Sequence, residues 1–377
     1  MIFGKAEPTE LSCTLARMLM DQILLLKVYQ YFKKVSIHFV VWFLAFIFWG
    51  LMRQFGHELV DGPDLGIGEL VLIYAMLAVC AGIVFASVDV LLPTNFSKRT
   101  SFGKAVLFRT AIYFVIFIFL VVLGISAFTF FDEKELSLHE RYRFIYSKEM
   151  LLLLFYCSLV VFHIHFVREL DRKFGKGNLL KMLLGSFHKP KEEDRVFMFL
   201  DLKSSTSIAE KLGHLKYSQM IQDCFLDLEA VFEYKAEVYQ YVGDEVVLTW
   251  TKESGVAASN CLSAFFNYRK RLKERSNYYK ARYDVIPQFK AGLNVGQIVV
   301  AEVGEKKREI AYHGDTINTA ARIQSECGTR GEEILISRAL FELVSQDDRY
   351  DFKSKGEVQL KGKLLKTEIY SVKEKED

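Results

Sequence analysis

Two short stretches decide the fold of the C-terminal half of this chain: Phe199-Leu-Asp-Leu-Lys-Ser-Ser-Thr206 and Tyr241-Val-Gly-Asp-Glu-Val-Val247. In each of them an aspartate, Asp201 or Asp244, lies next to an apolar β-type run and a turn. The Gly-Asp turn between two alternating runs predicts a β-hairpin, and the run before Asp201 predicts a buried strand. We expect the two carboxylates to meet at one sheet edge, where two Mg²⁺ ions on a nucleotide triphosphate require them.

A third stretch, Gly314-Asp-Thr-Ile-Asn-Thr-Ala-Ala-Arg322, predicts a helix. Asn318 and Arg322 are four residues apart and therefore share one face of that helix. Taken alone, these two residues are equally well explained as an ordinary exposed helix pair. Asp244 alone is likewise explained as a turn former, because Gly-Asp pairs are common in tight turns.

The composition divides this chain of 377 residues into two parts, and the length suits two domains. Hydrophobic residues, 51% of the total, are concentrated before residue 168. The net charge of +3, without a basic run, argues against a nucleic-acid partner. Six cysteines without a C-x-x-C pair predict buried free thiols in a reducing compartment. The N-terminus lacks the pattern of a cleaved signal peptide.

Four uncharged stretches precede residue 168, and each is long enough to cross a bilayer as a helix, which takes roughly 17–25 residues. They are Val35–Met52, Leu70–Val88, Thr110–Phe131 and Met150–Val167. A buried helix of a soluble protein explains any single one, but four in succession favour a membrane domain. Residues 35–167 are therefore predicted to form an α-helical transmembrane bundle in contact with the lipid bilayer.

The basic residues that flank the spans predict their orientation. They precede the first span, lie between the second and third, and follow the fourth: Lys33, Lys34, Lys98, Arg99, Lys104, Arg109, Arg168, Arg172, Lys173 and Lys176. The first hairpin is acidic instead. The positive-inside rule therefore places both termini in the cytoplasm, in a multi-pass protein of the inner (plasma) membrane.

Polar residues near the spans give weaker signals. Residues 1–34 predict a cytoplasmic interfacial helix, with a loosely packed arm as the alternative. His163 and His165 point about 200° apart on a helix, so we do not expect them to share a metal or haem. Asp89 lies at a span end and is expected to contact water, and the spans are expected to hold no intramembrane charge.

Residues 168–193 predict a helical linker between the two halves. Its leucines recur at helical spacing, and Gly175 and Gly177 predict a break followed by a second short helix. Two interpretations stay open: the leucines pair two linkers in a dimer, or they pack on the next domain.

The soluble domain, residues 194–377, alternates strands and helices. Predicted strands are Arg195–Leu200, Glu237–Val242, Glu245–Trp250, Gln288–Val295, Gln297–Val303, Glu333–Ser337, about Lys355–Leu360 and Lys366–Val372. Predicted helices are Ser204–Gly213, Leu215–Glu233, Gly255–Arg275 and Asp315–Cys327. This order fits an α+β sandwich with one sheet face covered by helices.

Four motifs of this domain resemble those of the class III nucleotidyl cyclases. They are Asp201-Leu-Lys-Ser-Ser-Thr, Tyr-Val-Gly-Asp244, Gly-Leu-Asn-Val-Gly296 and Gly-Asp-Thr-Ile-Asn-Thr-Ala-Ala-Arg322, in the family's order and spacing. The resemblance covers about residues 194–373 and leaves out the membrane half. It implies a ferredoxin-like core that works as a head-to-tail homodimer with active sites at the interface. Each motif alone could be an ordinary turn or helix pair. Because all four occur in the family's order and spacing, a functional site explains them better.

The resemblance also implies residue roles. Asp201 and Asp244, with Leu202 beside them, would hold two Mg²⁺ or Mn²⁺ ions per active site. The partner protomer's copies of Asn318 and Arg322 would position the ribose and offset charge on the α-phosphate. Backbone N–H groups of the turn after Asp201 would bind the β- and γ-phosphates: Lys203, Ser204, Ser205 and Thr206. Such parts suit phosphoryl transfer, which depends mostly on alignment and charge neutralisation.

Three further positions concern the triphosphate and the base. Lys361 falls where the family places a triphosphate-binding lysine, although a lysine at a strand edge is also commonplace. Gln240 and Ala311 fall at the two purine-reading positions and match neither the usual ATP pattern nor the usual GTP pattern. Glutamine can accept from the adenine amino group, so the prediction is ATP, with GTP or dual specificity as the alternative.

Parts of the sequence are also compatible with three other functions. Val242-Gly-Asp-Glu-Val resembles a diguanylate cyclase signature, but its first glycine is missing. A catalytically silent signalling scaffold and a transporter with a nucleotide-sensing appendage are the alternatives from other classes. The sequence leaves open whether the membrane domain senses an unidentified ligand or protein, or only anchors the enzyme.

Overall fold

The computed structural model describes residues 10–54, 67–91, 101–131, 147–175, 178–306, 308–359 and 366–375. The chain divides into two compact units, Met1–Glu169 and Leu170–Asp377. Each unit is described by itself.

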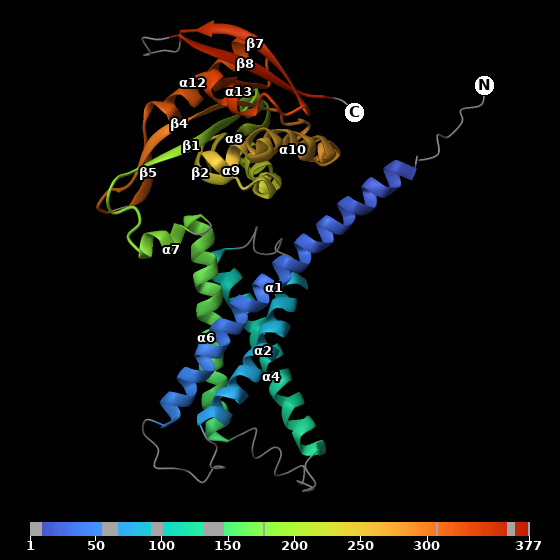
Figure 1. Ribbon diagram of the computed structural model, residues 1–377, viewed down its shortest axis with the longest axis vertical. Coiled ribbons are helices and arrows are strands. Elements are labelled where there is room, and N and C mark those ends of the chain that lie inside the picture. Colours follow the sequence, from blue (N-terminus) through green and yellow to red (C-terminus); the bar gives the residue numbers. More distant parts are fainter. Residues whose placement is uncertain are drawn as a thin grey trace, which may run out of the picture. The chain divides into compact units, whose positions relative to one another are not determined.

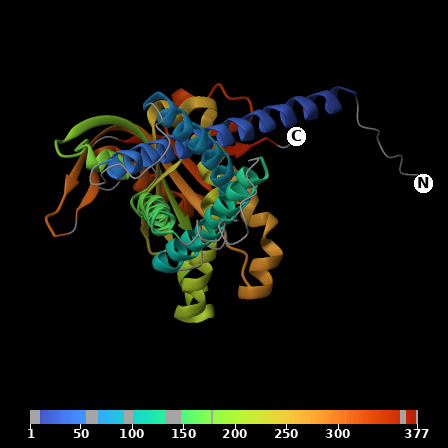
Figure 2. The ribbon, with the colours of Figure 1, turned by 90° about the horizontal axis from the view of Figure 1, so that it is seen from below.

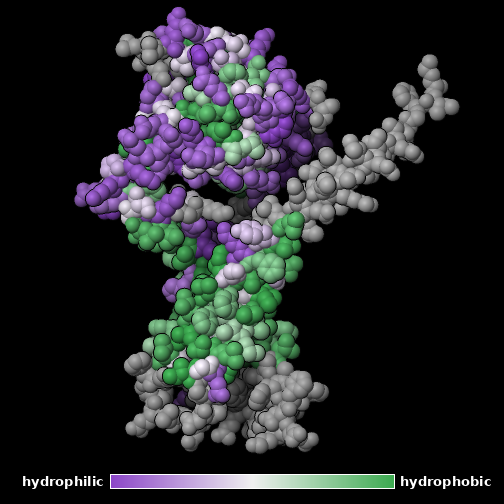
Figure 3. All heavy atoms as spheres, viewed as in Figure 1, coloured by the Kyte–Doolittle hydropathy of each residue, from purple (hydrophilic) through white to green (hydrophobic). Residues whose placement is uncertain are grey.

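The first unit consists of long apolar helices: α1 (Glu10–Gln54), α2 (Ile67–Leu91), α4 (Phe102–Phe131) and α6 (Lys148–Phe174) (Figures 1 and 2). Four segments of them are long and apolar enough to cross a membrane: Tyr31–Met52, Ile67–Leu91, Phe102–Leu123 and Met150–Lys173. On the face that Figure 3 shows, the described parts of these helices are hydrophobic, whereas the second unit is largely hydrophilic. An outward apolar surface is what lipid contact requires.

The helix α1 is continuous across the boundary that we predicted at residue 34 (Figure 1). No break separates the predicted interfacial helix from the first span, so the two form one rod over the residues described. An interfacial location for its N-terminal part stays a prediction.

A polar junction joins all four helices inside the first unit. Asp89 on α2 accepts hydrogen bonds from Arg168 on α6, at 2.5 Å, and from the hydroxyl of Tyr113 on α4. The Nε2 atom of His38 on α1 lies 3.0 Å from the same Asp89 carboxylate. The Asp89 side chain is only 9% exposed, so the expectation that it contacts water was wrong, and so was the expectation of no intramembrane charge. Buried charges inside a helical bundle are retained when they pair with one another.

The two histidines of α6 lie in different surroundings, as their spacing predicts. His165 is buried, and its ring meets the Tyr113 ring edge-on at 4.5 Å. His163 is exposed, with Nδ1 2.7 Å from the Leu159 carbonyl oxygen. They do not share a ligand face.

The second unit contains an eight-stranded sheet with the order β2-β3-β1-β4-β6-β8-β7, in which β5 pairs with β4. The strands are β1 (Lys191–Leu202), β2 (Glu237–Val242), β3 (Glu245–Thr251), β4 (Phe289–Val303), β5 (Glu309–His313), β6 (Ile334–Ser337), β7 (Tyr350–Val358) and β8 (Thr367–Glu374). The helices are α7 (Asn178–Leu183), α8 (Ser205–Asp227), α9 (Lys252–Val256), α10 (Asn260–Glu274), α11 (Ser276–Tyr283), α12 (Asp315–Arg330) and α13 (Arg338–Val344), with 3₁₀ turns η1 (Leu228–Tyr234) and η2 (Ala257–Ser259).

Both faces of this sheet are covered, because alternate side chains of the strands enter two different cores. Val196, Met198 and Leu200 of β1 join the main core with residues of α8, α10, α11 and α13. Phe197 and Phe199 point to the opposite face, where α12 packs. The prediction that helices cover one face of the sheet holds for α8, α9, α10, α11 and α13, but α12 covers the other face as a second helical layer.

A glycine allows α12 to approach the sheet closely. A Cβ atom at Gly292 on β4 would lie 2.1 Å from the backbone nitrogen of Gln324 on α12. Gly296 is also closely approached, since a Cβ there would lie 2.7 Å from the side-chain oxygen Oγ1 of Thr316 on α12. The prediction of two strands divided at Gly296 was wrong: β4 runs through it without a break.

Other differences from the predicted elements also have local causes. The helix predicted over Gly255–Arg275 is divided, because Ala258 and Ser259 have φ values of +48° and +50°. The prediction of a break near residue 213 is confirmed, since Gly213 has a φ of +72° inside α8. The strand β5 and the helices α11 and α13 were not predicted.

The linker contains the predicted helix, break and second helix. The helix α6 ends at Phe174, Gly175 has a φ of +87°, and α7 begins at Asn178. Phe187, downstream of α7, is buried against the α12 face of the sheet, and its carbonyl oxygen accepts a hydrogen bond of 2.9 Å from the Glu302 N–H. Over the described residues, this part of the linker packs on the soluble domain.

Candidate active site

Asp201 is the second-last residue of β1 and lies between two charged side chains. Its register neighbours are Glu245 on β3 and Lys290 on β4. The Lys290 ammonium is 3.2 Å from Asp201 Oδ2, and the same oxygen accepts a hydrogen bond of 3.0 Å from Gln324 on α12. Sheet register and the close approach of α12 therefore fix the Asp201 carboxylate on the α12 face.

Asp244 occupies the turn of the β2–β3 hairpin. Gly243 before it has a φ of +63°, which glycine adopts without strain at the first position of a two-residue hairpin turn. The Asp244 Oδ2 atom is buried, with no hydrogen-bond partner in the part of the chain described. Burial first, and then the charge of Asp244, raise the pKa of the nearby Tyr217 hydroxyl to about 12. A buried carboxylate oxygen without a partner is a natural ligand for a cation.

A third carboxylate, Glu245, belongs to the same cluster, and the sequence analysis missed it. Burial, followed by the charges of Asp201 and Asp244, raises the pKa of Glu245 to about 7. The hairpin itself pairs Glu245 with Val242, and only the register between β1 and β3, which are distant in the sequence, places Glu245 opposite Asp201. Three acids at one edge give the site an excess of negative charge.

This edge fits divalent cations that arrive with a phosphate ligand. No three His, Cys, Asp or Glu side chains in the described ranges form a ready-made metal site. Mg²⁺ characteristically takes one or two carboxylates and completes its coordination with substrate phosphates and water. The unpartnered Asp244 oxygen and the mutual repulsion of the acids suit that arrangement. The Leu202 side chain is buried in the opposite core, so only its backbone is available here.

The turn after Asp201 offers fewer phosphate-binding groups than predicted. The Lys203 N–H already donates to the Gln288 carbonyl oxygen at 2.8 Å. Ser204 is the N-cap of α8, with a φ of +59° and no side-chain capping bond. Ser205 and Thr206 then form the first turn of α8, where backbone N–H groups have no partner within a helix. Of the predicted set, Ser204, Ser205 and Thr206 remain as backbone donors.

Asn318 and Arg322 lie on α12, away from the carboxylates of their own chain. Asn318 is exposed and Arg322 is partly exposed, whereas Gln324, only 5% exposed, faces the sheet and Asp201. Arg322 and Gln324 are two residues apart, so they point about 200° from each other on the helix. One chain therefore does not bring Arg322 to its own Asp201.

The purine-reading candidates lie on β2 and β5. A β-bulge follows Val238, so that Gln240 pairs with Val247 and shares the α12 face with Tyr239. Ala311 pairs with Ala301 on β4 and is next to Tyr312, whose ring lies 4.7 Å from that of Tyr239. The structure thus joins the two strands through their tyrosines. Lys361 lies outside the described residues.

Replacement of Glu245 by Gln is expected to flatten the pH dependence of stability when divalent cations are absent. Below pH 4.5 the Glu245 carboxyl is protonated in both the folded and the unfolded state, whereas above its folded pKa of about 7 it is ionised in both. The free energy of unfolding should therefore fall between these values, by about 1–2 kcal/mol after allowance for solvent screening. Hydrogen exchange of β1 and β3 peptides from pH 5 to 8 measures this free energy. If its slope against pH is the same in Glu245→Gln as in the wild type, Glu245 is not the group responsible.

Comparisons with known proteins agree with this geometry. Residues 188–374 match the adenylate and guanylate cyclase catalytic domain family. Adenylate cyclase 2 of Rhizobium meliloti (strain 1021) is 33% identical over 208 residues, which cover 55% of this chain and 57% of that protein. The receptor-type guanylate cyclase gcy-13 of Caenorhabditis elegans is 28% identical over 193 residues, which cover 48% of this chain and 18% of that protein. The chain thus spans less than two thirds of either relative.

Among solved structures, a bacterial light-regulated adenylyl cyclase superposes with a TM-score of 0.51 at 18% identity, covering 60% of this chain and 67% of that chain. This likeness shows the fold of the soluble domain. Residues 188–374 therefore form a catalytic domain of the class III nucleotidyl cyclase family, preceded in the sequence by four helices long and apolar enough to cross a membrane.

Proposed function

We propose that the protein converts ATP to 3′,5′-cyclic AMP and pyrophosphate at composite active sites between two copies of the chain. The observation that carries this proposal is the division of the site residues. The acids Asp201 and Asp244 lie at one sheet edge, while Arg322 points away from them on the far side of α12. A head-to-tail dimer would bring the acids of one copy to the Asn318 and Arg322 of the other.

Each half of the site would perform a distinct task. Asp201 and Asp244 would hold two Mg²⁺ or Mn²⁺ ions, which activate the 3′-hydroxyl and neutralise the polyphosphate when bound. The N–H groups of Ser204, Ser205 and Thr206 would bind the β- and γ-phosphates at the start of α8. Lys290 would be free to approach the leaving pyrophosphate once cations replace it at Asp201. Each of these contacts acts by alignment and charge neutralisation.

The partner's residues would complete the transition state. Asn318 would fix the ribose, and Arg322 would offset the charge that develops on the α-phosphate. A guanidinium is suited to this because it offers several donors in a fixed planar arrangement. Asn318 is exposed and Arg322 is partly exposed, so both can reach a substrate.

The preference for ATP rests on Gln240 and on the similarity to a protein named as an adenylate cyclase. Gln240 is exposed on β2, where its amide can accept from the adenine amino group. Ala311 offers no side-chain hydrogen bond, so discrimination should be looser than in a matched pair. GTP or dual specificity is the alternative.

Kinetics with both nucleotides test the substrate. The full-length protein in membranes is assayed with ATP or GTP and with Mg²⁺ or Mn²⁺. We expect kcat/KM for ATP to exceed that for GTP, by less than about 100-fold because one base contact is missing. A higher kcat/KM for GTP would overturn the substrate assignment, and no product with either nucleotide would favour a silent scaffold.

We further propose that the four helices lie in the inner (plasma) membrane with both termini in the cytoplasm, as the basic flanks of the spans indicate. The cytoplasm supplies the ATP and Mg²⁺ that the catalytic domain would use. Because the linker residue Phe187 packs on the sheet, a movement of α6 would reach the catalytic domain through this segment.

A further inference from the structure

We propose that Arg195 is a positioning residue for the nucleotide base: it holds β2 and β5 in register, and these strands carry the base-reading positions Gln240 and Ala311. The inference rests on the proposed function, because it assigns Gln240 and Ala311 to the purine. It adds a residue that makes no contact with the substrate itself.

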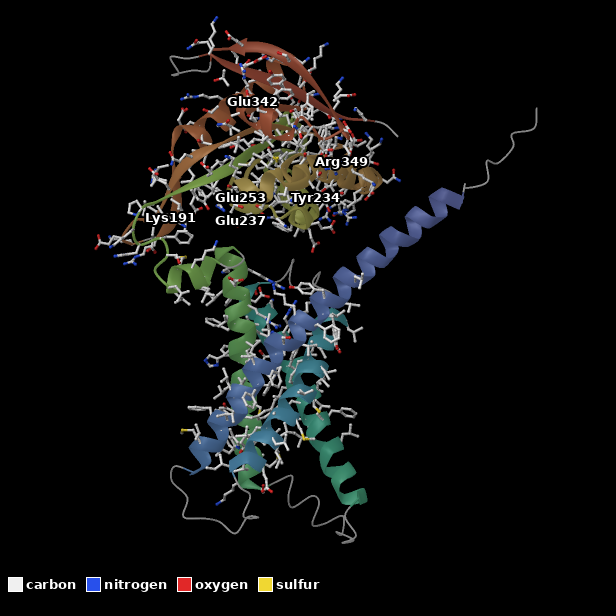
Figure 4. All side chains as sticks on the ribbon, in the orientation of Figure 1. Lys191, Tyr234, Glu237, Glu253, Glu342 and Arg349 are labelled. Atoms are coloured by element: carbon white, nitrogen blue, oxygen red, sulfur yellow. The ribbon has the colours of Figure 1, made fainter. Side chains whose placement is uncertain are left out.

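The contacts of Arg195 connect strands that are not neighbours in the sheet. Arg195 lies on β1, and its Nη2 donates to Glu237 Oε2 on β2 at 2.7 Å. Its Nη1 donates to the hydroxyl oxygen of Tyr312 on β5, and the guanidinium lies 5.1 Å from the centre of the Tyr312 ring. β3 separates β1 from β2, and β5 pairs only with β4. Glu237, labelled in Figure 4, thus belongs to a side-chain bridge across the face of the sheet.

Two tyrosines, Tyr239 and Tyr312, connect this bridge to the base-reading positions Gln240 and Ala311. The Tyr312 N–H, which belongs to the peptide bond with Ala311, donates to the Tyr239 hydroxyl at 3.4 Å. Tyr239 immediately precedes Gln240, and the β-bulge places the two on one face. The bridge therefore fixes the Ala311 peptide plane relative to the backbone that presents Gln240.

The burial of Arg195 supports a geometric role more than a stabilising one. Its side chain is 3% exposed, and its Nε has no hydrogen-bond partner among the described residues, while Glu237 is 42% exposed. A second acid, Glu193, lies 3.7 Å from Nε and is 26% exposed, so Arg195 pairs with two acids. Burying a guanidinium costs several kcal/mol, and ion pairs with partly exposed partners offset only part of that. The planar guanidinium of Arg195 can hold its partners in one fixed arrangement.

The test compares two variants of the full-length protein with a matched control. Arg195→Met removes the bridge, and Tyr312→Phe removes only the hydroxyl acceptor and should fold normally. Arg269→Met is the control, because Arg269 also pairs with two acids, Glu333 and Glu374, and lies over an aromatic ring, that of Phe266, remote from the base. The measurements are kcat and KM for ATP and GTP, and the Kd values of nonreactive ATP and GTP analogues with Mn²⁺.

Both test variants are expected to raise KM for ATP about 10-fold and to change the ATP-to-GTP ratio of kcat/KM at least about 5-fold, because small displacements of a positioning group have large effects. We expect kcat at saturating ATP to change less than about 3-fold. The KM and the nucleotide ratio of Arg195→Lys should lie between those of the wild type and Arg195→Met, and those of Arg269→Met should match the wild type. Unchanged ratios and analogue Kd values in Arg195→Met and Tyr312→Phe would overturn the proposal. Absence of any cyclic product from the wild type would overturn the proposed function, while the analogue Kd values would still decide the role of Arg195.

Discussion

Asp201→Asn is expected to abolish cyclic nucleotide formation while leaving the fold intact. The substitution keeps the shape of the side chain and the hydrogen-bond donor Gln324 but removes the negative charge that divalent cations require. We expect kcat to fall by at least about 1,000-fold, equivalent to roughly 4 kcal/mol of transition-state stabilisation. Cyclic nucleotide production by the full-length protein in membranes measures the rate, and Mn²⁺ affinity without nucleotide measures the metal directly.

Asp284→Asn is the matched control for this variant. Asp284 also pairs with lysines, Lys211 and Lys280, and its left-handed backbone, with a φ of +52°, suits asparagine. It should retain wild-type rates. Residual activity of Asp201→Asn above about one tenth of the wild type would show that Asp201 does not hold a catalytic cation.

Asp89→Ala is expected to destabilise the four-helix unit strongly. It leaves Arg168 without its carboxylate partner and removes the acceptor of Tyr113 and the neighbour of His38. Removal of one partner from a fully buried ion pair typically costs about 3–5 kcal/mol, because the remaining charge is uncompensated. The Arg168 side chain is 32% exposed, so we expect a loss at the lower end of that range. Thermal unfolding of the purified full-length protein in detergent, followed by protease resistance of the helices, measures the loss.

The double variant Asp89→Ala/Arg168→Met separates loss of the pair from loss of packing. With both charges removed, we expect much of the stability to return, since apolar replacement of a buried pair is often neutral. If the double variant is no more stable than Asp89→Ala alone, the junction does not act as an ion pair.

The sequence predicted most of the catalytic domain because its strands alternate strongly and its turns contain diagnostic glycines. β2 was predicted with its observed bounds, and the hairpin turn at Gly243 and Asp244 is confirmed. Gly292 and Gly296 were harder to interpret. A glycine in a strand signals either a break or the close approach of another element, and here α12 approaches at both positions.

Other features depend on contacts between distant segments, which no local pattern reveals. Asp89 at a span end is expected to contact water, yet His38, Tyr113 and Arg168 from three other helices surround it. Glu245 lies in the acidic cluster because the register between β1 and β3 places it opposite Asp201. Arg195 gave no signal in the sequence, because its partners Glu237 and Tyr312 lie 42 and 117 residues away.

Complementation between two inactive variants tests the composite site most directly. Asp201→Asn and Arg322→Ala are each expected to be inactive alone when expressed as full-length protein. When they are co-expressed, half of the randomly formed dimers are mixed and each mixed dimer keeps one intact site, so activity should return to about one quarter of the wild type. Recovery near that level would support a site shared between two chains. No recovery, with mixed dimers demonstrated by differently tagged copies, would contradict it.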